Sequence, residues 1–170
     1  MTDESFLETA RLLINPLTTD DDLFIFALVN SAGWIKFIGN RNITSKNEAG
    51  TYIQKILQNK NISYWVVKLK DDQERIGIIT FIKRDYLAHH DIGFAFLPEY
   101  SGRGYAHEAT NAVLHKLLLN YNLPHILAVT MAENISSIKL LKKLGLDFEN
   151  EITVENQLVH IYGAPGRITK

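Results

Sequence analysis

Apolar residues recur at two different spacings along the chain, and each spacing predicts one kind of element. One segment carries an apolar residue at every third or fourth position, as one face of a helix does. These residues are Ala49, Tyr52, Ile53, Ile56 and Leu57, with Thr44 or Ser45 as the N-cap. Further helices are expected over residues 21–30, 104–120 and 135–144, and Gly145 is the expected left-handed stop of the last one.

Segments rich in β-branched and aromatic residues predict strands before, between and after these helices. In residues 90–97, for example, Ile92, Phe94 and Phe96 alternate with smaller or polar residues. Strands are expected at residues 11–17, 63–69, 75–83, 90–97, 125–130, 147–152 and 158–162. The charged segment 70–74 predicts a hairpin turn between two of them.

The order of the expected elements, β-α-α-β-β-β-α-β-α-β-β, favours an α/β (α+β) fold. Three strands follow one another directly, which argues against a purely parallel sheet. We expect a mixed, twisted sheet with helices on both faces. Residues 1–170 contain no Pro/Gly/Ser-rich linker, low-complexity run or repeat, so a single domain is predicted.

Composition and charge narrow the classes of function. Hydrophobic residues make up 46% of the chain and charged residues 22%, as in an ordinary globular protein. The net charge of −1 builds no broad positive field, so neither a nucleic-acid nor a membrane partner is expected. The absence of cysteine excludes disulfides, thiolate metal sites and a cysteine nucleophile. Because no signal-like or membrane-spanning apolar segment is present, we expect a cytoplasmic location.

A glycine-containing turn joins the strand at 90–97 to the long helix. Gly102 and Gly104 permit a tight backbone path, and Ala106 permits close approach at the start of the helix. Free N–H groups there would face an anion, and Arg103 adds a positive charge. The alternative is an ordinary strand-to-helix turn. The segment lacks the Gly-Lys-Ser/Thr of a phosphate-binding P-loop and the third glycine of a dinucleotide-binding turn.

The same turn resembles a family motif. Residues 92–109 resemble the acetyl-CoA motif of the GNAT acyltransferase superfamily, and most of all its ribosomal-protein N-terminal acetyltransferase branch. The motif core, Gln/Arg-x-x-Gly-x-Gly/Ala, falls on Ser101, Gly104 and Ala106, with Ser101 departing from the usual residue. Residues 133–146 resemble the family's Asn-x-x-Ser/Ala helix, and residues 8–17 resemble the first strand of that branch.

The resemblance implies the GNAT fold, with a mostly antiparallel sheet of six to seven strands, and acetyl-CoA as co-substrate without a metal. The strand at 90–97 would splay away from the strand at 125–130. Its free edge would bind pantetheine, and a backbone N–H near Phe96 would polarise the thioester carbonyl. The residues implied to contact acetyl-CoA are Phe94, Phe96, Leu97, Ser101, Gly102, Arg103, Gly104, Tyr105, Ala106 and Asn134.

The family transfers the acetyl group directly to an amine, which leaves two proton transfers to assign. Leu141 stands where many members carry a tyrosine that protonates the thiolate, so the resemblance points to Ser137 as the proton donor. Asp91 and Glu99 are both candidates for the base. His89 and His90 would point to opposite faces of a strand and could not chelate a metal together.

The acceptor is expected to be a primary amine, either a peptide N-terminus or a small molecule. Its pocket would be lined by Trp34, Phe37, Ile38, Arg41, Tyr86 and His89, with the loop at 155–156 opposite. Packing of a connection between two helices is the alternative role for residues 34–38. A catalytically weak acyl-CoA-binding sensor or interaction module is the rival function. Small homodimers are common in the family, so a homodimer is one expected assembly.

Overall fold

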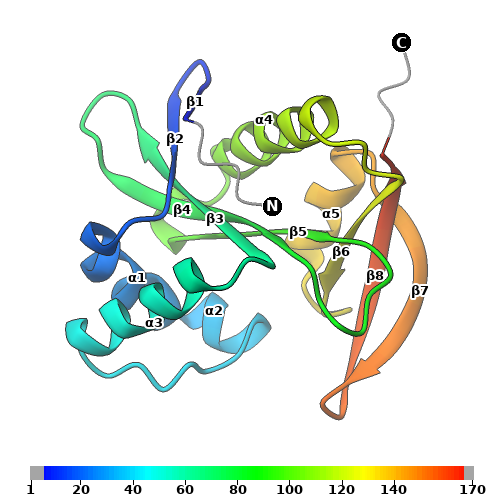
Figure 1. Cartoon of the computed structure of the whole chain (residues 1–170), viewed down its shortest axis with the longest axis horizontal. Helices are drawn as coiled ribbons and strands as arrows, with labels where there is room; N and C mark the ends of the chain where they lie inside the picture. The colour runs from blue at the N-terminus through cyan, green and yellow to red at the C-terminus, as the bar shows by residue number, and fades with distance from the viewer. Residues whose placement is uncertain (1–5, 167–170) are drawn as a thin grey trace.

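The computed structural model describes residues 6–166, and its strands form one eight-stranded sheet (Figure 1). The strands are β1 (Leu7–Glu8), β2 (Leu12–Pro16), β3 (Ile62–Leu69), β4 (Arg75–Ile82), β5 (Asp91–Phe96), β6 (His125–Thr130), β7 (Asp147–Val154) and β8 (Gln157–Pro165). Their spatial order is β1-β2-β3-β4-β5-β6-β8-β7. Every neighbouring pair is antiparallel except β5 and β6, which are parallel. The predicted mixed, mostly antiparallel sheet is confirmed.

Helices cover both faces of this sheet, as predicted. They are α1 (Asp22–Val29), α2 (Ala32–Phe37), α3 (Lys46–Gln58), α4 (Tyr105–Asn120) and α5 (Ile135–Lys143), with short 3-10 turns η1 (Thr19–Asp21) and η2 (Pro98–Tyr100). Helices α1, α2 and α3 lie on one side of the sheet, and α4 and α5 lie on the other (Figure 1). Within residues 6–166, no helix is both long enough and apolar enough to cross a membrane.

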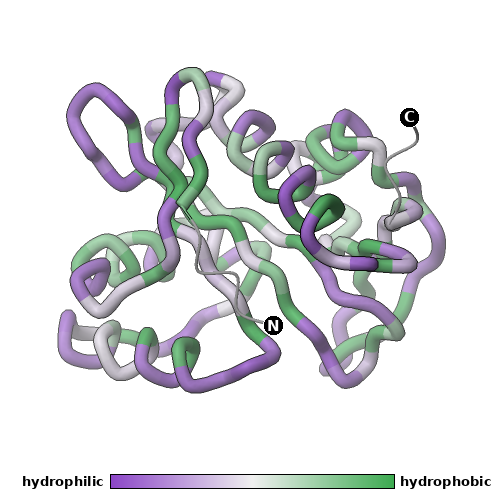
Figure 2. The backbone as a smooth tube through the Cα atoms, turned by 45° about the horizontal axis from the view of Figure 1, so that its top comes forward, coloured by the Kyte–Doolittle hydropathy of each residue, from purple (hydrophilic) through white to green (hydrophobic). Residues whose placement is uncertain are grey.

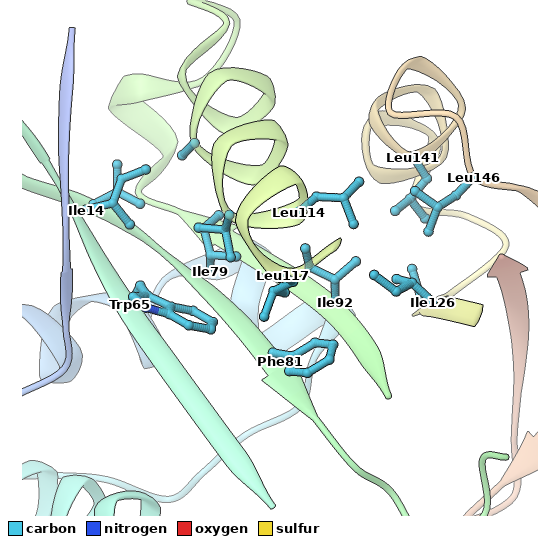
Figure 3. Packing of buried hydrophobic residues seen from close by; sticks show 14 of the residues in the cluster. Ile14, Trp65, Ile79, Phe81, Ile92, Leu114, Leu117, Ile126, Leu141 and Leu146 are labelled. Atoms are coloured by element: carbon cyan, nitrogen blue, oxygen red, sulfur yellow. The ribbon is translucent and has the colours of Figure 1, made fainter. Parts of the chain in front are cut away.

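The alternation of side chains in β3 creates two separate cores. Trp65 and Val67 are buried in the cluster beneath α4, whereas Val66 is buried with residues of α1 and α3. Figure 3 shows Leu114 and Leu117 of α4 packed over the sheet residues of the first cluster. The apolar stretches of the tube follow the strands and the inner helix faces, and polar stretches follow the outer turns (Figure 2).

One strand and one α-helix were not predicted. The strand β1 has only two residues, too few for an alternating pattern, and forms because Leu7 pairs opposite Ile14. It brings the number of strands to eight, whereas six or seven were predicted. The helix α2 has six residues with Gly33 near its start, so it is too short to display a helical period.

Most other boundaries match within one or two residues. Strand β6 has the predicted bounds, and Gly145 ends α5 with φ of 86°. Ser45 caps α3, since its hydroxyl accepts a hydrogen bond from the Glu48 N–H. Strand β8 continues three residues beyond its predicted end because it pairs with β6 along the whole length of that strand, from His125 to Thr130.

Candidate active site

Strands β5 and β6 separate almost as soon as they have paired. Their only register pair is Asp91 with Leu127, and the Leu127 N–H donates to the His90 carbonyl at 3.0 Å. Beyond this point the two parallel strands diverge, so the sheet has a notch between its two halves. The predicted splay of these strands is confirmed.

The divergence leaves one edge of β5 without a strand partner. The Leu97 N–H donates toward β4, to the Ile76 carbonyl at 2.9 Å, whereas the His90 carbonyl faces β6. Because backbone groups alternate sides along a strand, the N–H groups of Phe94 and Phe96 face the notch. Within residues 6–166, neither of these two N–H groups has a backbone partner. An extended ligand could therefore add to β5 as a further strand would.

The glycine turn follows β5 directly and opens the long helix α4. Gly102 and Gly104 have φ values of 74° and 81°, in the left-handed region that favours glycine. Gly104 is the N-cap of α4, and no side chain caps the helix. Within the described chain, the N–H groups of residues 102–107 donate to no other residue. The turn thus presents a row of unpaired donors at a helix N-terminus, which suits an anion such as a pyrophosphate.

A salt bridge that the sequence did not predict anchors this turn to the connection between β1 and β2. The Arg11 guanidinium pairs with the Glu108 carboxylate at 2.7 Å and donates to the Arg103 carbonyl at 2.9 Å. The hydroxyl of Thr9 donates to Glu108 at 2.6 Å. Burial alone would raise the pKa of Glu108, but these hydrogen bonds and the charge of Arg11 outweigh it and hold the pKa below its ordinary value. The carboxylate beside the helix N-terminus is therefore already neutralised.

A groove of about 1050 Å³ runs from this turn past the notch to α2, α3 and the β7–β8 hairpin. Ten of the thirteen predicted site residues line it: Asp91, Phe94, Phe96, Ser101, Gly102, Gly104, Tyr105, Ala106, Asn134 and Ser137. Leu97, Glu99 and Arg103 do not line the groove, and Glu99 is exposed on η2. We call the part formed by residues 101–107 and the free edge of β5 the cradle end.

Ser137 and Asn134 lie at the first turn of α5, on the wall of the groove. The Asn134 side-chain oxygen accepts a hydrogen bond from the Ser137 N–H at 3.2 Å, so Asn134 caps the helix. The Ser137 hydroxyl makes no hydrogen bond to another described residue, which leaves it able to donate to a ligand. Leu141, one turn further along the same helix, is 1% exposed and packs in the core.

Asp91 lies at the start of β5, at the closed end of the notch. It is 2% exposed, and its carboxylate accepts a hydrogen bond from the Arg84 Nε at 2.8 Å. Burial raises the pKa of Asp91, and the charge of Arg84 offsets only part of that increase. A raised pKa makes this carboxylate a stronger base than an ordinary aspartate, which suits it to accept a proton.

The other end of the groove is formed by side chains from several elements. Five of the six residues predicted for the acceptor pocket line it: Trp34, Phe37, Ile38, Arg41 and Tyr86. His89 does not line it, because its ring packs edge-on against His125 of β6. The β7–β8 hairpin forms the opposite wall, as predicted, and its turn places Glu155 in the left-handed region with φ of 49°.

Several groove residues were not predicted from the sequence, because nothing in the local pattern marks them. Tyr64 of β3 and Tyr52 of α3 both line the groove. Burial is the main cause that raises the pKa of Tyr64, and the nearby Tyr52 raises it further. Lys55 of α3 and Arg84 after β4 also line the groove. We call the part formed by Trp34, Arg41, Tyr52, Lys55, Tyr64 and Arg84 the arginine end.

Histidines do not assemble a metal site in this region. The ring of His90 stacks on Phe81, with ring centroids 4.6 Å apart, just before β5 begins. Among residues 6–166, no group of three or more His, Cys, Asp or Glu side chains could hold a metal ion.

The comparisons with known proteins agree with this geometry. The sequence model of the acetyltransferase (GNAT) domain family matches residues 11–147. The uncharacterized N-acetyltransferase YnaD of Bacillus subtilis is 31% identical over 142 residues, which cover 82% of this chain and 81% of YnaD. The chain belongs to the GNAT family and is an N-acetyltransferase, which confirms the family predicted from the sequence.

Two solved structures share the fold at lower sequence identity. The spermidine N-acetyltransferase of Vibrio cholerae, in complex with CoA and spermine, has a TM-score of 0.79 and 21% identity, covering 93% of this chain and 97% of that one. A Vibrio cholerae protein provisionally assigned as a ribosomal-protein-serine acetyltransferase has a TM-score of 0.79 and 18% identity, covering 97% and 99%. At these identities, both likenesses show a shared fold.

Proposed function

We propose that this N-acetyltransferase uses acetyl-CoA as donor and transfers the acetyl group directly to a primary amine. One observation carries the proposal: the free edge of β5 leads straight into the unpaired N–H groups of residues 102–107, within one groove. An extended ligand that carries an anionic group at one end fits this arrangement. The CoA bound by the Vibrio cholerae spermidine N-acetyltransferase supports the same assignment.

The residues of the cradle end fit the parts of such a donor. The N–H groups of residues 102–107 would bind the pyrophosphate, and Phe94 and Phe96 would pair with the pantetheine arm along β5. Acetyl-CoA supplies an activated thioester. The Phe96 N–H would donate to the thioester oxygen and stabilise the negative charge that develops there. Arg103 and Leu97, which do not line the groove, would add only long-range charge and backbone structure.

Two side chains would handle the protons. The ammonium form of the acceptor would lose a proton to the Asp91 carboxylate, directly or through a water, and become a nucleophilic amine. As the amine nitrogen bonds to the acetyl carbon, the carbon–sulfur bond breaks, and the thiolate would take a proton from Ser137. The proton that the new amide nitrogen loses would then pass, through water, to the Ser137 oxygen. The exposed position of Glu99 outside the groove favours Asp91 over Glu99 as the base.

The acceptor class we propose is the one predicted from the sequence, a peptide N-terminus or a small-molecule amine. The names of the two solved neighbours include a polyamine and a ribosomal protein, so both kinds occur on this fold. The single domain, the cytoplasmic location and the homodimer stay predictions.

The first experiment is isothermal titration with acetyl-CoA, followed by a thiol-release assay with a panel of amines and N-terminal peptides. We expect micromolar binding and thiol release that depends on an acceptor. Binding without release for any amine would favour the acyl-CoA sensor instead. No binding would overturn the assignment of the cradle end.

A further inference from the structure

The charged side chains at the arginine end are mostly cationic. Arg41, Lys55 and Arg84 line this part of the groove, and the acidic residues on it are Asp91 and Glu155. These five side chains come from separate segments: the loop after α2, helix α3, the loop after β4, the start of β5 and the β7–β8 turn. The fold therefore collects positive charge that no sequence segment carries alone.

Pairing removes two of these charges and leaves two cations. Arg84 and Asp91 neutralise each other at 2.8 Å. Within residues 6–166, Arg41 and Lys55 form no ion pair with a carboxylate, and Glu155 lies exposed at the tip of the hairpin. The arginine end thus keeps a positive charge that a ligand could balance.

Arg41 is exposed on the groove, as Lys55 is, but it lies beside the aromatic wall. Its guanidinium lies 5.9 Å from the ring centroid of Trp34, which is buried at the base of α2. Its charge also reaches the buried Tyr64 hydroxyl, where the charges of Arg41 and Arg84 partly counter the effect of burial. A planar guanidinium held in this way suits a carboxylate or a phosphate, which accept two parallel hydrogen bonds.

We propose that the acceptor amine carries an anionic group, a carboxylate or a phosphate, which Arg41 binds together with Lys55 while the amine lies near Asp91. This inference rests on the proposed function and deepens it by naming the acceptor class. A polyamine fits poorly, because its remaining ammonium groups would be repelled by Arg41 and Lys55. With Asp91 paired to Arg84, Glu155 is the one lining carboxylate of residues 6–166 left to attract them. The site therefore differs in charge preference from that of a spermidine acetyltransferase.

Matched amine pairs test the proposal. The substrates are glycine oligomers of one to three residues, each as the free acid and as the C-terminal amide, together with O-phosphoethanolamine, ethanolamine and spermidine. We expect kcat/KM at least about tenfold higher for the anionic member of the preferred pair, and a smaller ratio at high salt. The peptide and phosphate arms distinguish a carboxylate from a phosphate as the recognised group. Equal values within every pair, or a preference for spermidine, would overturn the proposal.

Variants locate the anion site. In Arg41→Gln, and more so in Arg41→Gln/Lys55→Gln, the ratio of kcat/KM between the anionic member and its neutral partner should fall about tenfold, and the Kd of acetyl-CoA should stay unchanged. Lys142→Gln is the matched control, since this exposed lysine of α5 lies outside the groove. A preference that survives both Arg41 variants would overturn the assignment.

A binding measurement separates this proposal from the proposed function. N-acetylated glycine oligomers, as acids and as amides, are titrated into the protein with CoA present, so that no turnover is required. The acid should bind about tenfold more tightly, and Arg41→Gln should remove the difference. Equal binding would overturn the anion site even if transfer is observed, whereas an acid preference without any transfer would overturn only the proposed function.

Discussion

The cradle end and the arginine end of the groove are built from different parts of the chain. The cradle end offers backbone N–H groups from β5 and residues 102–107, which one continuous segment supplies. The arginine end offers side chains from β3, α3 and several loops. A backbone site depends on conformation, so we expect it to tolerate Ser101 in place of the usual motif residue. A side-chain site changes its preference with a single substitution.

The largest effect is expected where the two ends meet, at Asp91. Asp91→Asn should lower kcat/KM by about 10²- to 10⁴-fold, because the amide can still accept from Arg84 but cannot take a proton. Burial raises the pKa of Asp91, so wild-type activity should rise with pH through a pKa above the ordinary range of aspartate. The pH profile of kcat/KM should lose this acidic limb in the variant.

The chain offers a matched control for this substitution. Asp21 is 3% exposed and pairs with Arg75 at 2.6 Å, outside the groove. Asp21→Asn should cost comparable stability in urea unfolding but leave kcat/KM unchanged. Full activity of Asp91→Asn would remove it as the base.

The next largest effect tests whether the cradle end works through backbone conformation. Gly104→Ala places a Cβ at φ of 81°, where a non-glycine residue costs roughly 1–2 kcal/mol, and 3.4 Å from the Arg11 guanidinium. We expect the Kd of acetyl-CoA to rise by about tenfold or more in titration calorimetry. Gly145→Ala, at φ of 86° on the far end of α5, should lose similar stability without changing that Kd. Equal Kd changes in both variants would contradict a specific cradle.

A smaller effect is expected at Ser137, on the wall between the two ends. Ser137→Ala should lower kcat by about tenfold and leave the Kd of acetyl-CoA unchanged, because the hydroxyl acts only on the departing thiolate. Ser136→Ala is the control for the loss of a groove hydroxyl, since Ser136 is exposed and lines the same groove. Unchanged kcat in Ser137→Ala would mean that solvent protonates the thiolate.

The smallest functional effect is expected at the anchor of the cradle end. Glu108→Gln removes the ion pair with Arg11 and should cost about 1–2 kcal/mol of unfolding free energy at neutral pH. Because the fold holds the pKa of Glu108 below 4.5, this stabilisation is present above 4.5 and is lost as the pH falls through the lowered pKa. Urea unfolding should show wild type and variant converging at acidic pH. A constant difference down to that range would exclude a role for the carboxylate charge.

Local sequence predicted the elements that carry a clear period or a cap. The helix α3 follows its apolar spacing and its Ser45 cap, and α4 begins after the left-handed Gly104. The short α2 was missed because six residues show no period, and tertiary burial of Trp34 stabilises it instead. The two-residue β1 likewise depends on pairing with β2.

The sequence by itself determined the glycine turn of the cradle end, because glycines at fixed spacing before a helix encode a backbone conformation directly. The free edge of β5 depends on the divergence of β5 from β6. The sequence also determined that α5 begins at Ile135 and carries Ser137 in its first turn. Only the tertiary structure decided that Glu99 lies outside the groove while Asp91 lies on it, paired with Arg84. It alone brought Arg41 and Lys55 to the same end of the groove. The sequence pattern does not show whether charged side chains on separate elements lie close together, since their distance depends on how the sheet and helices pack.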